Sequence, residues 1–225
     1  KHSETPTPVF KGRVVIMGSD VRDVENNQVY FADTASSPTS MAAVRSVIQY
    51  SQLHGENATV ADAEQAYIQP LLPDSVVFFL EIPEELRTAK MRELAAGMVR
   101  PVWRLRRPLY GWARSGNIWQ KHFAQAIRDL DAKANATRER LLDHLQTDKS
   151  WRELEGWPQT FVKIGPMGKP IVLTVYVDDC IMGGPGHQAE WPKIRSVIRT
   201  TEPEILNRVL GVHHHFRKEG TVIHT

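Results

Sequence analysis

Two adjacent aspartates, Asp178 and Asp179, stand in the middle of the apolar, β-branched run PIVLTVYVDDCIMGG at residues 170–184. The flanking segments IVLTVYV and CIMGG favour strands, so we expect a hairpin that carries both acids at its tip. Neighbouring carboxylates repel each other and need compensation. Water supplies it at an ordinary exposed turn, and a divalent cation such as Mg²⁺ supplies it where several carboxylate oxygens converge.

A third carboxylate, Asp62, ends a short β-like run in ATVADAEQAYIQP, five residues before Tyr67. Hard cations prefer carboxylate oxygens, and two-metal sites bring together several such ligands. A second acidic segment therefore favours the metal interpretation of the aspartate pair. Tyr67, taken by itself, is typical of a core aromatic residue.

Basic residues gather between Arg100 and Arg114, where RPVWRLRRPLYGWAR holds five arginines and no acid. Trp103, Tyr110 and Trp112 are interleaved with them. Arginines beside aromatic rings favour contact with the phosphates and bases of nucleic acid. The net charge of the whole chain, +2 from 28 basic and 26 acidic side chains, gives no such indication.

Lys11 and Arg13 are two positions apart in FKGRVVIM, residues 10–17, which we expect to form a strand. Side chains two apart on a strand project from the same face, so this pair could meet a triphosphate together. Two solvated charges on an edge strand are the alternative.

Length and composition bound the class of protein. With 225 residues, 41% of them hydrophobic, the chain can bury a core and is expected to form a single domain. No apolar run approaches the roughly 18 to 20 residues of a membrane span, and KHSETPTPVFKG lacks the apolar stretch of a signal peptide. The single cysteine, Cys180, excludes an internal disulfide and suits a reducing compartment. We expect an intracellular protein that is not secreted and has no membrane partner.

The first helix is predicted within residues 35–55. Ser37 is expected to cap it, Pro38 suits its first position, and Gly55 ends it. Apolar residues at helical spacing would form its buried face.

Further elements follow from periodicity and turn residues. A helix is expected from 117 to about 130, and the charged segment 131–156 is expected to be a helical surface excursion. Another helix is expected within 189–201. Strands are predicted within 57–69, 75–83, 159–165 and 170–177, with a closing hairpin over 209–225.

Several of these segments follow one another in a recognisable order. D-x-x-x-A-[FY] at 62–67 is followed by LYG with a downstream Trp, then by YVDD, then by LGV. In this order the motifs resemble those of the reverse transcriptase of copia-type LTR retrotransposons, over about residues 10–216. FKGRVVIMG is similar to the family's Lys-x-Arg-Leu-Val strand, RRPLYGWARSGNIW to its Leu-Tyr-Gly-Leu-Lys-x-Ser segment, and VLGVHHHF to its primer-gripping strand.

The resemblance implies an α+β fold of the right-hand polymerase type, in which an antiparallel sheet carries the aspartates and helices pack on one of its faces. It implies a single reverse transcriptase domain, 1–225, with a loose tail at 1–9, partial fingers at 10–57 and a palm at 58–225 that includes the excursion near 131–156. A thumb, an RNase H domain and an integrase are not expected in this chain. Other domains of a retroelement polyprotein are expected partners.

The implied activity is RNA-directed DNA synthesis, in which dNTPs are added to a primer on an RNA or DNA template, in a cytoplasmic particle or in the nucleus. Two Mg²⁺ or Mn²⁺ ions would be the cofactors. Asp62 and Asp178 would be catalytic ligands shared between the ions, and Asp179 a weaker or more distant one.

The resemblance also assigns roles around the metal site. Lys11 and Arg13 would meet the nucleotide's phosphates, and Tyr67 would lie under the incoming sugar and exclude a 2′-hydroxyl. Gly111 would let the backbone come close to the nucleotide or template.

Two further positions concern the template and the primer. Ala113 stands where the family usually has Lys or a similar polar residue, so the neighbouring Arg114 is the candidate for template contact. Leu210 and Gly211 belong to the expected primer-gripping strand.

Two alternatives stay open. A truncated or inactive retroelement remnant would bind nucleic acid without catalysis. A metal-dependent phosphohydrolase would also use the paired carboxylates, but it leaves LYG and LGV unexplained.

Overall fold

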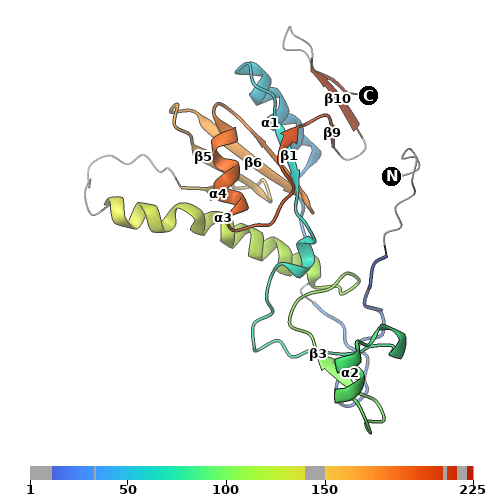
Figure 1. Cartoon of the computed structure of the whole chain (residues 1–225). Helices are drawn as coiled ribbons and strands as arrows, with labels where there is room; N and C mark the ends of the chain where they lie inside the picture. Colours follow the sequence, from blue (N-terminus) through green and yellow to red (C-terminus); the bar gives the residue numbers. More distant parts are fainter. Residues whose placement is uncertain (1–11, 33, 140–149, 210–211, 217–221, 225) are drawn as a thin grey trace.

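The computed structural model of the chain shows a mixed α+β protein with two lobes (Figure 1). It describes residues 12–32, 34–139, 150–209, 212–216 and 222–224. One lobe is built on a six-stranded antiparallel sheet, and the other holds α2, β2 and β3. The predicted α+β class with an antiparallel sheet is confirmed at this level.

The large sheet has the strand order β4-β5-β6-β7-β1-β8. Its strands are β1 Thr59–Asp62, β4 Arg152–Glu153, β5 Thr160–Ile164, β6 Pro170–Tyr176, β7 Asp179–Gly183 and β8 Glu204–Ile205. The β-branched and aromatic residues of β5, β6 and β7 give these strands a buried, pleated surface on both faces. The strands predicted within 159–165 and 170–177 are confirmed. The predicted return strand is also formed, but it begins at Asp179, so only Asp178 lies in the turn.

The centre of the sheet sets the position of the acidic residues. β6 and β7 form a hairpin in which Tyr176 pairs with Asp179, so Val177 and Asp178 make a two-residue turn. β1 runs antiparallel to β7 and places Asp62 directly opposite Asp179. Paired residues in neighbouring strands have side chains on the same face, so the two carboxylates meet.

Helices cover both faces of this sheet. Because successive side chains of a strand point to opposite faces, neighbouring residues of β7 pack against different helices. Cys180 and Met182 pack with α3 (Ser115–Glu139) and α4 (Trp191–Arg195), whereas Ile181 packs with α1 (Met41–Leu53). The prediction that helices pack on one face is therefore wrong, since α1 lies on the face opposite to α3 and α4 (Figure 1).

The helix boundaries differ from prediction at two places. Ser40, not Ser37, caps α1, because its hydroxyl accepts the backbone N–H of Ala43; the Ser37 amide donates instead to Gln120 Oε1. α3 continues past residue 130 to Glu139, so the beginning of the predicted excursion is part of this helix, and residues 140–149 lie outside the described part of the chain. The end of the predicted helical excursion, 150–156, is not helical, because Arg152 and Glu153 pair with β5 as strand β4.

The segment 189–201 is less helical than predicted. A 3₁₀ turn, η3 (His187–Glu190), leads into α4, which ends at Arg195 after five residues. Beyond it the chain returns to the sheet, where Thr200 bridges to Ala63.

The second lobe has its own small core around Leu72, Leu105 and Trp112. Its strands are β2 (Phe79–Glu81) and β3 (Val102–Arg104), with 3₁₀ turn η2 (Glu84–Leu86) and helix α2 (Ala89–Leu94). Ile16 and Phe31 pack on the same core. Residues 70–112 are thus packed with the segment before α1, while α1 itself belongs to the sheet lobe.

The strand predicted at 10–17 is not formed by its described residues, 12–17. Ile16 donates its N–H to the carbonyl of Tyr110 over 2.7 Å, but no ladder develops from that bond. A β-branched run makes a strand only where a neighbour offers successive partners.

The last described segments form a separate three-stranded sheet, β11-β10-β9, from β9 (Arg208–Val209), β10 (Val212–Phe216) and β11 (Val222–His224). The antiparallel pairing of β10 with β11 confirms the predicted closing hairpin. Within the described ranges no helix has the length and apolar character needed to cross a membrane.

Candidate active site

Three carboxylates converge where β1 ends and the β6–β7 turn closes. Oxygens of Asp62, Asp178 and Asp179 all lie within 4.8 Å of one another. Asp62 and Asp178 are exposed, and Asp179 is half-buried. Residues far apart in the sequence thus form one acidic group that is open to solvent, as the metal interpretation predicts.

Backbone hydrogen bonds fix the segments that carry these acids. Asp62 donates its N–H to the hydroxyl of Thr201 over 3.0 Å and accepts the Thr201 N–H at 2.9 Å. Ala63, the next residue, donates its N–H to the carbonyl of Asp178 over 2.7 Å. β1, the turn and the chain after α4 are therefore joined at the acidic group itself.

The turn between β6 and β7 is strained. Val177 has a φ of 59°, in the left-handed region that β-branched residues strongly disfavour. The indole N–H of buried Trp119, on α3, donates to the Val177 carbonyl over 2.6 Å. Strain of this kind persists only where surrounding contacts over-determine the backbone, and Trp119 provides such a contact.

The acidic group changes the chemistry of its neighbours. Burial, together with the charges of Asp179, Asp62 and Asp178, raises the pKa of the Cys180 thiol far above its ordinary range. The thiol is therefore protonated at neutral pH and is a poor nucleophile. Burial, followed by the charge of Asp178 and by Tyr110, raises the pKa of Tyr67, so its phenol stays neutral beside the acids.

The acidic group fits a divalent cation. Mg²⁺ binds oxygen at about 2.0 to 2.1 Å, so oxygens on opposite sides of one ion lie roughly 4 Å apart. The observed spread of up to 4.8 Å is close to that value, and exposed carboxylates can close the difference by small rotations. A few carboxylates with remaining positions for water or substrate is the donor set that Mg²⁺ and Mn²⁺ take.

A row of side chains leads away from the acids. Tyr67 packs against Tyr110 with ring centroids 4.9 Å apart, and the guanidinium of exposed Arg13 lies 5.3 Å from the Tyr110 ring centroid. Two predicted site residues, Tyr67 and Arg13, thus both lie beside the Tyr110 ring, and the charge of Asp178 acts on Tyr67. Tyr110 joins them and was not predicted as a site residue; its signal in the sequence is its place in the arginine-rich segment 100–114.

Other predicted site residues have different surroundings. Gly111 has a φ of 85°, and a Cβ there would lie 2.1 Å from the carbonyl oxygen of Ile16. This close approach requires glycine without any nucleotide. The Arg114 guanidinium lies 5.9 Å from the ring centroids of both Phe31 and Trp112. Lys11, Leu210 and Gly211 lie outside the described residues.

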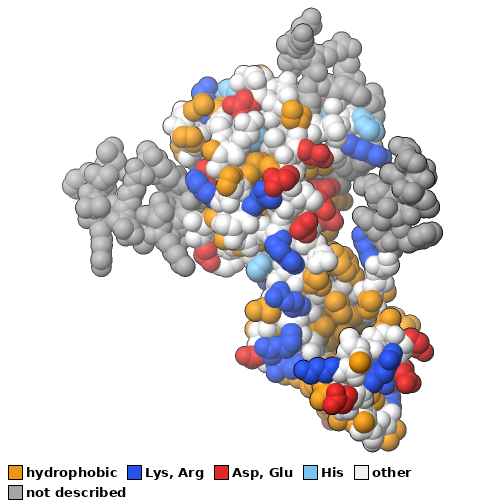
Figure 2. Space-filling model, in the orientation of Figure 1, with side chains coloured by type: hydrophobic (Ala, Val, Ile, Leu, Met, Phe, Trp, Pro, Cys, Tyr) orange, Lys and Arg blue, Asp and Glu red, His pale blue; other side chains and the backbone are white. Residues whose placement is uncertain are grey.

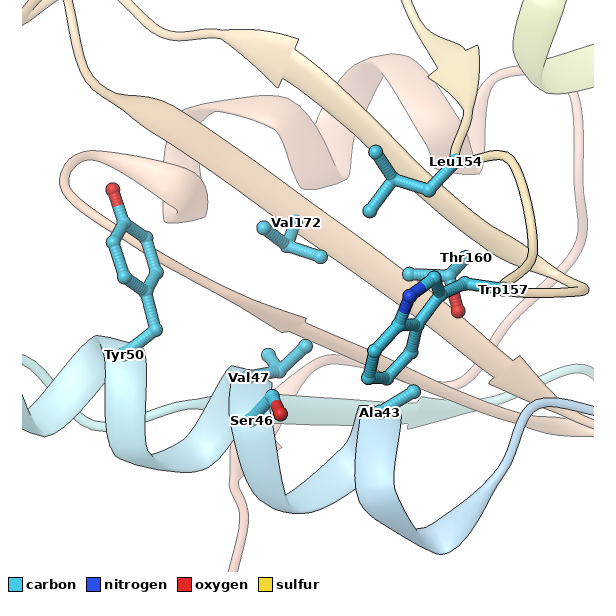
Figure 3. A pocket seen from close by; sticks show the side chains of 8 residues that line it. All are labelled: Ala43, Ser46, Val47, Tyr50, Leu154, Trp157, Thr160 and Val172. Atoms are coloured by element: carbon cyan, nitrogen blue, oxygen red, sulfur yellow. The ribbon is translucent and has the colours of Figure 1, made fainter.

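An apolar hollow of about 250 Å³ opens between α1 and the sheet (Figure 3). Its lining residues are Ala43, Ser46, Val47, Tyr50, Leu154, Trp157, Thr160 and Val172. The hydroxyl of Tyr50 is used in a bond to the carbonyl of Pro170. None of these described lining residues carries a carboxylate, imidazole, thiol or amine.

No family model, curated protein or solved structure matches this chain. The candidate site consists of three converging carboxylates with the neutral Tyr67 beside Asp178. The exposed Arg13 lies over Tyr110, which packs against Tyr67.

Proposed function

We propose that this chain is the RNA-directed DNA polymerase domain of a copia-type retrotransposon polyprotein, with its sheet lobe as the palm. The observation that carries the proposal is the convergence of Asp62 with Asp178 and Asp179 within 4.8 Å. The acids come from the two motifs that the resemblance names as catalytic, and those motifs lie on neighbouring antiparallel strands.

Each residue of the candidate site would have its own role in nucleotide addition. Asp62 and Asp178, the two exposed acids, would hold the metal ions, and half-buried Asp179 would support them. Neutral Tyr67, beside Asp178, would border the sugar of the incoming nucleotide. Arg13, which is exposed and held over Tyr110, would meet the triphosphate.

Bound Mg²⁺ or Mn²⁺ would activate the primer's 3′-hydroxyl and neutralise charge on the transferring phosphoryl group. The protein's contribution is to fix the ligands. The tie from Trp119 to Val177 and the bonds joining Asp62 to Thr201 would keep the carboxylates in place before the ions bind.

The direct test is incorporation of labelled dTTP on oligo(dT)-primed poly(rA), with Mg²⁺ or Mn²⁺, by the purified chain and by Asp178→Asn. Asp129→Asn is a matched control, because Asp129 is an exposed aspartate on α3 whose carboxylate accepts a bond from Gln125. We expect extension by the unmodified chain and by the control, and loss of at least about 100-fold in Asp178→Asn, because even residues that only support a metal ligand contribute roughly 10- to 100-fold.

The opposite outcomes distinguish the alternatives. Absence of extension, with primer-template still bound, would overturn the polymerase proposal in favour of a nucleic-acid-binding remnant. Phosphate release from a nucleotide without any primer-template, lost in Asp178→Asn, would favour a metal-dependent phosphohydrolase.

A further inference from the structure

A stripe of arginines follows one side of the molecule and joins its two lobes. Figure 2 shows Lys and Arg side chains lined up over the α4 and α3 side of the sheet lobe and continuing onto the second lobe. We define the basic stripe by five exposed arginines, Arg195, Arg199, Arg107, Arg106 and Arg104.

Gln69 links the two halves of the stripe. Its side chain donates to the carbonyl of Arg199 over 2.9 Å and accepts the Arg199 N–H at 3.0 Å. The Arg107 guanidinium binds the carbonyls of Ile68 and Gln69. Arg199 and Arg107 are therefore held on either side of one residue, although they belong to different lobes.

A polar hollow of about 450 Å³ lies at the α4 end of the basic stripe, close to the end of β1. Arg195, Arg199, Ser196 and Thr200 line it, together with Glu64 and Pro192. Among the described residues, the Arg199 guanidinium has no hydrogen-bond or ion-pair partner. Arg195 pairs with Glu202, but that carboxylate is 79% exposed, and such a surface pair contributes little.

The carboxylates beside the basic stripe do not neutralise its positive charge. Arg104 and Arg106 share the single carboxylate of Asp74, which is 85% exposed. Glu64 and Glu202 are the acids beside Arg195 and Arg199, at the α4 end of the basic stripe. Five guanidinium groups thus face three carboxylates, and the surplus positive charge is concentrated at Arg199 and Arg107.

We propose that the basic stripe binds the phosphate backbone of a nucleic-acid strand, with Arg195 and Arg199 holding one phosphate in the hollow and Arg107 the next stretch of backbone. Guanidinium forks match phosphate geometry, and the hydroxyls at the hollow's edge are further donors. The lining is polar apart from Pro192, unlike the apolar core of a protein interface. Contacts to phosphates do not depend on base sequence, so the basic stripe should bind strands of any sequence.

This inference does not rest on catalysis by the aspartates. It concerns arginines on the α4 side, and it predicts binding even where Asp178→Asn has abolished activity. It deepens the polymerase proposal if that holds, because a strand on the stripe would pass Glu64, two residues from Asp62.

The test is fluorescence anisotropy with a labelled oligo(dT) of about 20 nucleotides, titrated at several salt concentrations against Arg195→Gln/Arg199→Gln and Arg45→Gln. Arg45 is a matched control, an exposed arginine on α1 on the opposite face of the sheet. We expect affinity to fall about tenfold or more in the double variant, and the salt slope to fall by roughly 1 to 1.5, with the control unchanged. Urea midpoints of all variants establish that each is folded.

Equal affinity and equal salt slope in the double variant and the unmodified chain would overturn the proposal. Tighter binding of poly-glutamate than of the oligonucleotide, lost in the same variant, would also overturn it and assign the stripe to an acidic protein. In Asp178→Asn the oligonucleotide should bind as in the unmodified chain, which separates this result from the fate of the polymerase proposal.

Discussion

The indole N–H of Trp119 donates to the backbone carbonyl of Val177 over 2.6 Å, although the two residues are 58 positions apart. Trp119 is 1% exposed and belongs to the core between α3 and the sheet. A core residue thereby holds the strained turn that carries Asp178.

Trp119→Phe should keep most of the packing and remove this hydrogen bond. We expect the free energy of unfolding to fall by about 1 to 3 kcal/mol, because the partly buried Val177 carbonyl loses its donor. Mn²⁺ affinity, measured by isothermal titration calorimetry, should also fall, since the Asp178 turn is no longer held.

Trp191→Phe is the matched control. Trp191 is 2% exposed and donates its indole N–H to the hydroxyl of Thr59 over 2.8 Å, at the far end of β1 from Asp62. The control should lose comparable stability and keep its Mn²⁺ affinity. Equal weakening of Mn²⁺ binding in both variants would show that Trp119 acts through general stability alone.

The close approach of two loops in the second lobe predicts a large cost for Gly111→Ala. A Cβ at Gly111 would overlap the Ile16 carbonyl at 2.1 Å, and the φ of 85° disfavours any L side chain. We expect a loss of roughly 2 to 4 kcal/mol from overlap and backbone strain together, measured by urea unfolding.

Gly97→Ala measures the backbone strain without the steric overlap. Gly97 has a similar φ of 82°, but a Cβ there would meet nothing within 4 Å. It should cost about 1 to 2 kcal/mol, the strain alone. A cost for Gly111→Ala no greater than this would mean that the Ile16 segment moves aside freely.

The Cys180 thiol should resist alkylation in the folded protein. It is fully buried, and burial with three nearby carboxylates raises its pKa, so almost no thiolate forms. Iodoacetamide at pH 8, followed by mass spectrometry, should leave Cys180 unmodified in buffer and modify it in urea. Rapid labelling in buffer would mean that β7 opens readily, against the packing described.

Local pattern predicted the elements that lie at the sheet's centre. The runs of β5, β6 and β7 are short, rich in β-branched residues and bounded by Gly and Pro, and these features indicate strands that are buried on both faces. The convergence of Asp62 with the aspartate pair followed from motif order. The helix predicted from 117 to about 130 is confirmed as part of α3, and its side chains Trp119 and Phe123 are buried in the core.

Features that depend on distant partners were not predictable. Residues 12–17 look like a strand but find only one backbone partner at Tyr110. The sequence predicts the apolar face of α1, but it does not indicate which face of the sheet this helix covers. Ser37 and Ser40 are equally good caps in isolation, and the contact of Ser37 with Gln120 on α3 distinguishes them.

A buried ion pair lies in the core beside β5. Lys163 and Glu190, with side chains 5% and 4% exposed, are joined at 2.9 Å, and Lys193 donates to the other Glu190 oxygen at 2.8 Å. Burial disfavours the charged form of Glu190, but hydrogen bonds from Lys193 and Lys163 outweigh it and lower its pKa below the usual 4.5. A carboxylate with a lowered pKa contributes stability above its unfolded pKa, and this is lost as pH falls through the folded pKa.

Glu190→Gln should therefore lower the free energy of unfolding by about 3 to 5 kcal/mol at neutral pH, because the buried ion pair between Lys163 and Glu190 is broken. Below pH 4.5 the gap between the variant and the unmodified chain should narrow, as Glu190 itself becomes protonated in the unfolded chain and then in the folded one. Urea midpoints between pH 3 and 7 measure both effects. Glu202→Gln, which removes an exposed pair with Arg195, should change stability by less than about 1 kcal/mol at any pH. A constant gap between Glu190→Gln and the unmodified chain across this range would show that packing, not the charge of Glu190, stabilises the core at this point.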